Sequence, residues 1–229
     1  MLLDSIKAGL TRVGAMTPQR LLIQVQAASN YLQLGRWAHD RGFVRPRVRT
    51  REAVWDAIMR ELDGGHALYL EFGVAYGESL RYWASHLKSA TDVFHGFDSF
   101  EGLPQGGGPW EKGRFDAKGC VPDIADERVR FFKGWFEDVL PAYSIPPHDT
   151  LILNMDADLY SSTIYVLRCL QPYIRPGTFI YFDEINHIEH EARAFDQFVD
   201  ETGLRFELIC ADTTLAHAAF RCVGAAMGE

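Results

Sequence analysis

The chain has 229 residues, of which 47% are hydrophobic and 24% charged, and its net charge at neutral pH is -8. These values are typical of a globular protein with one large core, and the negative charge argues against the binding of nucleic-acid phosphates as the main activity. The four cysteines lack metal-binding spacing, and no apolar run is long enough to span a bilayer. Because a secretory signal pattern is also lacking, we expect a cytoplasmic protein that does not bind membranes.

The first sixty or so residues are predicted to be helical. Thr50 is a candidate N-cap, and Val54 and Ile58 recur at helical spacing in the segment that follows it. A pair of glycines then ends this helix. We therefore expect residues 1–63 to form an N-terminal helical cap that belongs to the same domain as residues 64–229.

After this cap, apolar strands alternate with helices, which is typical of a parallel sheet covered on both faces. Strands are predicted over residues 67–73, 92–98, 129–134, 150–156, 178–184, 206–211 and 216–222, and helices over 78–87, 160–173 and 189–202. The last two strands are joined by a segment too short for a parallel crossover, so they should pair antiparallel. The predicted fold class is α/β, with a seven-stranded mixed sheet, an antiparallel last strand and helices on both faces.

A glycine-containing turn joins the first of these strands to its helix. Gly73 and Gly77 remove side chains where the backbone must approach a ligand closely, and the helix that begins at Glu78 directs its free amides toward that place. The dinucleotide fingerprint GxGxxG is absent, which favours a cofactor without a pyrophosphate. Asp98 ends the second strand, where it can accept hydrogen bonds from the two hydroxyls of a ribose; an Asx turn is the alternative.

Acidic residues follow the strands at 150–156 and 178–184. Asp156 and Asp158 end the first of them, and Asp183 and Glu184 end the second. Because the carboxyl ends of parallel strands meet at one edge of the sheet, we expect these carboxylates to converge in a crevice. They would repel one another unless they share a proton or a cation, and their oxygen ligands suit Mg²⁺. The pattern indicates a metal-assisted catalytic site.

Three residues are candidates for proton transfer in this site. Asp156 is the first choice for a metal ligand that can also act as a base. Asp158 is a second candidate, although an N-cap role for the next helix explains it equally well. His187 can face the acceptor as a base or hydrogen-bond donor, or it can be an exposed loop histidine.

A long excursion without predicted secondary structure covers residues 99–126. Connections of this length are often lids or disordered segments. Trp110, Arg114 and Phe115 are its residues best able to grip a flat or sugar-like acceptor. The two interpretations, a lid that excludes water and a surface loop without such a role, both remain open.

Four segments of the chain resemble a known family: ALYLEFGVAYGES, FHGFDSFEGLP, LNMDADLYSST and FIYFDEINH. They are similar, in order and spacing, to the class I S-adenosylmethionine-dependent methyltransferases, which have a Rossmann-like fold. More narrowly they resemble the macrocin O-methyltransferase family, which methylates sugar hydroxyls on macrolides and related natural products. The resemblance covers about residues 68–198 and does not extend to the helical cap.

The resemblance implies a role for each part of the site. The implied cofactor-binding residues are Glu71, Gly73, Tyr76, Gly77, Ser79, Asp98, Ser99, Gly134, Trp135 and Phe136. In the family the glycine turn holds the methionine end of the cofactor, the acid after the second strand holds the ribose, and the stretch after the third strand flanks the adenine. The implied magnesium ligands are Asp156, Asp183 and Glu184; the family commonly has two aspartates where this chain has Asp183 and Glu184.

The sequence therefore predicts an enzyme that transfers a methyl group from S-adenosylmethionine to a hydroxyl of a small natural product, plausibly a sugar, with the help of Mg²⁺. Alternatives are a metal-independent methyltransferase, a glycosyltransferase that uses the Asp156-Ala157-Asp158 DxD motif, and a non-catalytic binding protein. The expected partner is a small-molecule acceptor with a hydroxyl group. The sequence leaves the oligomeric state open, a homo-oligomer included.

Overall fold

A computed structural model describes residues 2–43, 47–107 and 110–225 of the chain. The chain divides into two compact units, Met1–Arg41 and Gly42–Glu229. The first unit contains the helices α1 (Leu2–Met16) and α2 (Gln19–Asp40), most of whose large apolar side chains are exposed. Neither these two helices nor any other in the described part of the chain has the length and apolar character that crossing a membrane would require.

The second unit is built on a mixed sheet whose described residues form eight strands. The strands are β1 (Arg47–Val48), β2 (Ala67–Phe72), β3 (Val93–Asp98), β4 (Val129–Lys133), β5 (Thr150–Met155), β6 (Phe179–Phe182), β7 (Leu204–Asp212) and β8 (Ala218–Ala225), in the order β1-β7-β8-β6-β5-β2-β3-β4. The prediction of seven strands was one too few. The additional strand, β1, has only two residues, which pair with Ala211 and Asp212 at the edge of the sheet, and so short a strand has no periodic pattern to detect.

The closing strands pair as the sequence predicted. β8 runs antiparallel to both β6 and β7 and lies between them, whereas β2, β3, β4, β5 and β6 are mutually parallel. β2 is flanked by β3 on one side and β5 on the other, so the strand order reverses there. The carboxyl ends of these strands meet at one edge of the sheet, which is where ligands bind in open α/β sheets.

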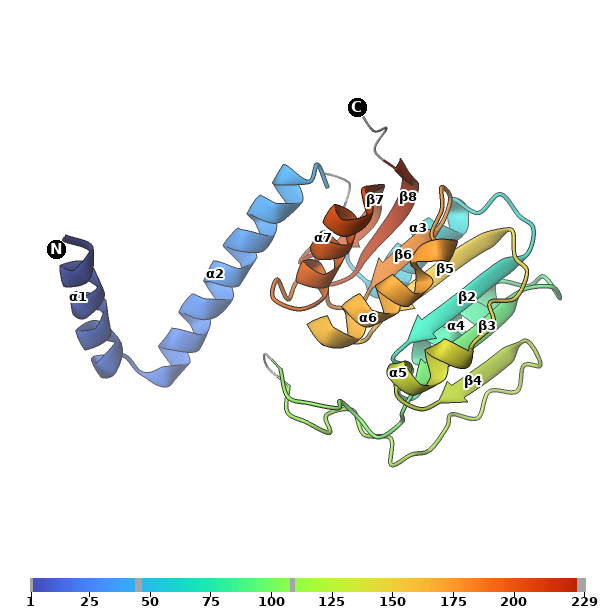
Figure 1. Cartoon of the computed structure of the whole chain (residues 1–229), viewed down its shortest axis with the longest axis horizontal. Coiled ribbons are helices and arrows are strands. Elements are labelled where there is room, and N and C mark those ends of the chain that lie inside the picture. Colours follow the sequence, from blue (N-terminus) through green and yellow to red (C-terminus); the bar gives the residue numbers. More distant parts are fainter. Residues whose placement is uncertain (1, 44–46, 108–109, 226–229) are drawn as a thin grey trace. The chain divides into compact units, whose positions relative to one another are not determined.

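Helices cover both faces of this sheet (Figure 1). α5 (Phe136–Val139), α6 (Tyr160–Leu170) and α7 (Glu191–Thr202) lie in front of it in this view, and α3 (Arg51–Arg60) and α4 (Glu78–His86) lie behind it. Short 3₁₀ turns follow α5 and α6 at Leu140–Ala142 and Gln171–Tyr173. α3, which the sequence analysis assigned to the helical cap, is part of the second unit.

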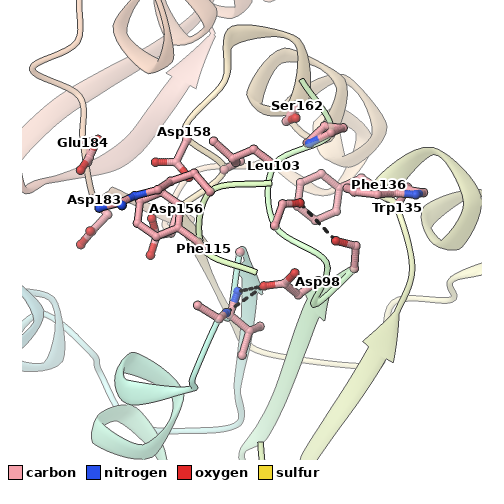
Figure 2. Close-up of a pocket in the computed structure, with 18 of the residues that line it drawn as sticks. Asp98, Leu103, Phe115, Trp135, Phe136, Asp156, Asp158, Ser162, Asp183 and Glu184 are labelled. Atoms are coloured by element: carbon pink, nitrogen blue, oxygen red, sulfur yellow. Dashed lines mark hydrogen bonds between the residues drawn. The ribbon is translucent and has the colours of Figure 1, made fainter. Parts of the chain in front are cut away.

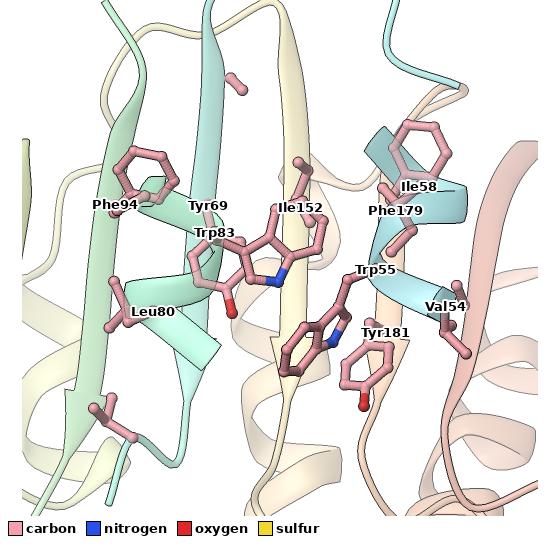
Figure 3. Close-up of a cluster of buried hydrophobic side chains, with 14 of the residues drawn as sticks. Val54, Trp55, Ile58, Tyr69, Leu80, Trp83, Phe94, Ile152, Phe179 and Tyr181 are labelled. Atoms are coloured by element: carbon pink, nitrogen blue, oxygen red, sulfur yellow. The ribbon is translucent and has the colours of Figure 1, made fainter. Parts of the chain in front are cut away.

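Aromatic residues fill the space between the sheet and the helices α3 and α4 (Figure 3). Trp55 of α3 and Trp83 of α4 are at most 2% exposed, and they pack against Tyr69, Ile152 and Tyr181 from β2, β5 and β6. Alternate residues of a strand point to the same face, so the intervening residues of these strands face the other helical layer. This packing fixes the position of α3 relative to the carboxyl edge of the sheet.

A close approach of backbone to backbone joins β2 and β5 at that edge. Gly73 follows β2 with a φ of +94°, and a Cβ atom at this position would lie 1.8 Å from the carbonyl oxygen of Asp156. Real Cβ atoms do not approach an oxygen so closely, and L side chains rarely adopt this φ. Only glycine therefore allows the turn after β2 to lie against the residue that ends β5.

We expect Gly73→Ala to destabilise the fold strongly. Gly177→Ala is a matched control, because Gly177 has the same φ of +94° and open space where its Cβ would stand. The control should lose about 1–2 kcal/mol through backbone strain, and Gly73→Ala should lose at least about 2 kcal/mol more through the clash. Urea unfolding of both variants measures the difference; equal losses would show that the contact with Asp156 carries no constraint.

Candidate active site

A pocket of about 300 Å³ lies at the carboxyl ends of β2, β3, β5 and β6, a volume that suits a small-molecule site. Figure 2 shows its two ends: Asp156, Asp158, Asp183 and Glu184 gather on one side, and Trp135 and Phe136 lie on the other. Twelve of the sequence-predicted site residues line it: Gly73, Tyr76, Ser79, Asp98, Ser99, Gly134, Trp135, Phe136, Asp156, Asp158, Asp183 and Glu184.

Asp98 organises the glycine turn. Its Oδ2 accepts hydrogen bonds of 2.8 Å from the backbone amides of Val74 and Ala75, and its Oδ1 accepts one of 2.7 Å from the amide of Phe100. The last bond is the Asx turn that the sequence offered as an alternative. The carboxylate also lines the pocket, so the turn role and a ligand role coexist in one side chain.

Two of the predicted cofactor residues, Glu71 and Gly77, lie behind the pocket lining. The side chain of Glu71 is fully buried and accepts hydrogen bonds from the hydroxyls of Tyr69 and Ser79. Burial raises the pKa of Glu71 to about 8, against the effect of those two hydrogen bonds. Gly77 is the N-cap of α4, with a φ of +74°. Glu71 is thus bonded to Ser79 in the first turn of α4, and Gly77 joins the glycine turn to that helix.

Asp158 has a conformation that argues for a site role. The N-cap residue of α6 is Leu159, and no side chain caps that helix, so the alternative N-cap role of Asp158 is not realised. The residue has a φ of +57°, an uncommon value that strained functional residues often show. Burial, followed by the charges of Glu184 and Asp183, raises its pKa to about 7, and it lines the pocket.

Asp156 and Asp183 lie in the same pocket with opposite electrostatic balances. Burial and then the charges of Asp183 and Asp158 raise the pKa of Asp156. Burial acts in the same direction on Asp183, but bonds from His217 and from the hydroxyl of Tyr181, at 3.2 and 2.7 Å from its Oδ1, outweigh burial and lower its pKa. The surroundings of Asp183 therefore favour its ionised form, whereas those of Asp156 favour its protonated form.

Glu184 and Glu191 have carboxylate oxygens without hydrogen-bond partners among the described residues. Glu184 Oε2 is buried, with His187 Nε2 at 3.6 Å as an ion-pair contact, and burial followed by the charge of Asp183 raises the pKa of Glu184 to about 7. Glu191 begins α7, accepts a hydrogen bond from the amide of Glu184, and leaves its Oε1 unsatisfied. Burial raises its pKa well above the usual range.

His187 packs beside the acidic end and does not line the pocket. Its ring lies edge-on to Trp110 with the ring centres 4.6 Å apart, and His190 contacts the same indole at 5.5 Å. Burial, followed by the charge of His190, lowers the pKa of His187. In this arrangement His187 supports the excursion, and its predicted role as a base remains a prediction.

The excursion folds back on itself and lines part of the pocket. Leu103 and Arg114 are joined by a backbone hydrogen bond of 2.9 Å, and Leu103, Arg114 and Phe115 are lining residues. Trp110 instead packs with Leu103 and Leu159. Residues 108 and 109 of the excursion lie outside the described residues. The prediction that Arg114 and Phe115 contact the site is consistent with this placement, whereas closure as a lid stays a prediction.

Sequence reasoning missed four residues of the site. Arg51 and Ser162 line the pocket, His217 is paired with Asp183, and Glu191 is buried behind Glu184. Arg51 falls in the helix predicted after Thr50 and Glu191 in the helix predicted over residues 189–202, and neither lies in a segment that indicates a site. The one available signal was the capping pattern after Thr50, which places Arg51 at the start of α3.

The order of the strands and the site define a protein class. The fold is similar to that of NovP, an O-methyltransferase, with a TM-score of 0.54 and 26% identity over 76% of this chain and 77% of NovP. It is also similar to CalS11, described as a calicheamicin methyltransferase, with a TM-score of 0.53 and 22% identity over 75% of this chain and 76% of that one. The chain thus has the Rossmann-like fold of the class I methyltransferases.

Part of the chain also matches a more specific family within this class. Residues 120–220 match the family described as Macrocin-O-methyltransferase (TylF). The chain is 38% identical over 91 residues to demethyldecarbamoylnovobiocin O-methyltransferase of Streptomyces niveus, which covers 39% of this chain and 34% of that protein. It is 31% identical over 147 residues to a tetracenomycin-C 4'-O-methyltransferase of Streptomyces olivaceus (53% and 54%), whose substrate is a rhamnosyl derivative.

These findings confirm the resemblance to the macrocin O-methyltransferase family. The matched residues contain the acids after β5 and β6, and the glycine turn and Asp98 precede them. The chain spans about a third to a half of the length of these two relatives.

The buried carboxyl of Glu71 should make stability depend on pH. Its pKa is raised from 4.5 to about 8 in the folded chain, so the folded state keeps a proton that the unfolded state loses. The free energy of unfolding therefore falls as the pH rises between these values. We expect the stability of Glu71→Gln relative to the wild type to increase from about pH 5 to about pH 8.5 in urea unfolding.

The exposed Glu127 provides the control for that measurement. Glu127→Gln should change the stability by the same small amount at both pH values. A difference between Glu71→Gln and the wild type that does not vary with pH would contradict the buried, protonated state of Glu71.

Proposed function

We propose that the chain transfers a methyl group from S-adenosylmethionine to a hydroxyl group of a small natural product, with a sugar hydroxyl as the acceptor. The observation that carries this proposal is the two-ended pocket, in which Trp135 and Phe136 lie at one end, the carboxylates after β5 and β6 lie at the other, and the glycine turn lies against Asp156. The similarity to O-methyltransferases that act on antibiotics supports it. The glycosyltransferase alternative loses support, because Asp158 shares one pocket with the glycine turn.

In this proposal the cofactor lies across the first end of the pocket. Asp98 accepts hydrogen bonds from the ribose, and Trp135 and Phe136 flank the adenine. The methionine end extends toward the glycine turn and the start of α4. When bound, S-adenosylmethionine supplies a sulfonium-bound methyl group for an in-line displacement.

In the proposed reaction the chain mainly aligns the two substrates and supplies a base that accepts the hydroxyl proton. Holding the acceptor oxygen in line with the methyl group and sulfur supplies about 7–11 kcal/mol in favourable cases. Asp158 is the proposed base, since it lines the acidic end and a pKa of about 7 suits proton transfer near neutral pH. Asp156 is the alternative base. Leu103 and Phe115 from the excursion cover the acceptor and exclude water.

The carboxylate oxygens at the acidic end are also suitable ligands for a divalent cation. Asp156, Asp183 and Glu184 offer hard oxygen ligands, and the buried Glu184 Oε2 lacks a hydrogen-bond partner among the described residues. In the present arrangement the described residues contain no group of three or more His, Cys, Asp or Glu side chains that could hold an ion. We propose that these three acids would hold Mg²⁺ once the side chain of Glu184 moves toward the two aspartates. The cation would lower the pKa of the acceptor hydroxyl.

Substitutions at the two ends of the pocket should separate binding from turnover. Asp98→Ala should weaken S-adenosylhomocysteine binding about tenfold or more through lost hydrogen bonds. Asp158→Asn, which removes the proposed base, and Asp156→Asn, which removes the alternative base and a proposed metal ligand, should leave that affinity nearly unchanged and lower methyl transfer to a panel of small glycosides about a hundredfold or more. Calorimetry and transfer of labelled methyl groups measure the two effects, and the exposed Asp138→Asn is the control.

The proposal fails if calorimetry shows no binding of S-adenosylmethionine, with or without Mg²⁺, or if UDP-glucose binds in its place. Equal loss of cofactor affinity in Asp98→Ala and Asp156→Asn would show that the two ends are assigned incorrectly.

The metal part of the proposal has its own test. Mg²⁺ titrated into the protein loaded with S-adenosylhomocysteine should release measurable heat, and Asp183→Asn should abolish it because a hard-oxygen ligand is lost. Asp138→Asn should retain it. Absence of Mg²⁺ binding to the wild type would favour a metal-independent reaction in which the acids bind the acceptor directly.

A further inference from the structure

Two arginines face a lining rich in acids. Among the described residues, Arg51 and Arg114 are the lining side chains with a fixed positive charge, and seven lining side chains are acidic: Glu78, Asp98, Glu137, Asp156, Asp158, Asp183 and Glu184. An anionic ligand group entering this pocket needs a cation beside it, because an unpaired charge in a partly buried site is costly. The position of the two arginines therefore decides where such a group can bind.

The indole ring of Trp55 holds the side chain of Arg51 in place. Arg51 is the first residue of α3, directly after the N-cap Thr50, and its guanidinium carbon lies 5.2 Å from the ring centre of the buried Trp55. This cation–π contact orients a planar group that can bind a carboxylate with two parallel hydrogen bonds. The side chain of Arg51 is 31% exposed, so it is accessible from the pocket.

The carboxylates that contact Arg51 are exposed and replaceable, and one of them is Glu52, whose Oε1 lies 3.5 Å from Arg51 Nε and whose side chain is 44% exposed. Arg51 Nη2 donates a hydrogen bond of 2.8 Å to Glu78 Oε2, and the side chain of Glu78 is 73% exposed. Ion pairs with so exposed a partner contribute little to stability. A ligand carboxylate could take the place of Glu78 at small cost.

Arg51 also lies near the glycine turn, where the methionine end of the proposed cofactor would bind. Glu78 and Ser79 begin α4, directly after the glycine turn, whereas Trp135 and Phe136 lie away from the acids at the other side in Figure 2. A cofactor with its adenine at Trp135 and its ribose at Asp98 must extend its methionine end toward the glycine turn. The first amides of α4 add a favourable potential for negative charge there.

We infer that Arg51 binds the α-carboxylate of the methionine end of S-adenosylmethionine and releases Glu78 when it does so. This inference rests on the proposed function and assigns to α3 a direct role in cofactor binding. It makes Arg51 a determinant of cofactor affinity, and Glu78 a competitor of the ligand carboxylate.

Three ligands test this assignment by calorimetry: S-adenosylhomocysteine, decarboxylated S-adenosylmethionine and 5′-methylthioadenosine, of which only the first carries the carboxylate. Arg51→Gln should weaken binding of S-adenosylhomocysteine about tenfold or more and leave the other two within about twofold. Arg51→Lys should fall between, because it keeps the charge and loses the two-pronged geometry. Arg168→Gln is the matched control, because it removes an exposed arginine that is paired with Glu201 outside the pocket, and it should change none of the three affinities.

Glu78→Gln provides an independent measurement. Removing the competing carboxylate should raise the affinity for S-adenosylhomocysteine and leave that for the decarboxylated ligand unchanged. Equal effects of Arg51→Gln on all three ligands, or no effect on any, would overturn the assignment while the wild type still binds S-adenosylhomocysteine. Failure of the wild type to bind any of the three would instead overturn the proposed function, and the assignment with it.

Discussion

The contact between Gly73 and the carbonyl of Asp156 is the constraint on which the rest of the site depends. It brings the turn after β2 against the end of β5 with no side chain between them, and β2 and β5 pair in parallel over six residues up to this point. The glycine turn and the first acid are therefore parts of one backbone seam. In the proposed reaction, this seam sets the distance between the sulfonium and the acceptor oxygen without any movement of the chain.

The second constraint is electrostatic. Carboxyl groups from β5 and β6 crowd one end of the pocket, and the bonds of Asp183 with His217 and Tyr181, together with the charge of Arg51, stabilise the ionised form of that carboxyl. The raised pKa values of Asp158 and Glu184, to about 7 in each case, express the remaining repulsion and burial. Such a site favours ligands that bring a proton to share or a positive charge, and a hydroxyl acceptor and a sulfonium satisfy these two requirements.

Much of the sheet was predictable because buried parallel strands are continuous apolar runs, as β2 and β5 show, and because the acids stand directly after them. The two-residue β1 was not predictable, since its pairing with β7 depends on tertiary packing. Asp158 was ambiguous in the sequence, and its backbone conformation favoured the site role. Arg51 could not be recognised, because its place in the pocket follows from how Trp55 packs α3 under the sheet.

The excursion after β3 differs from the seam in how it is held. Leu103 and Phe115 reach the pocket from a segment fastened by its own backbone bonds and by Trp110 against His187 and His190, and Phe115 adopts a left-handed conformation. The excursion is thus held separately from the β2–β5 junction. In the proposed reaction, this separation means that new acceptor ranges can be selected in the excursion while the geometry of methyl transfer is retained.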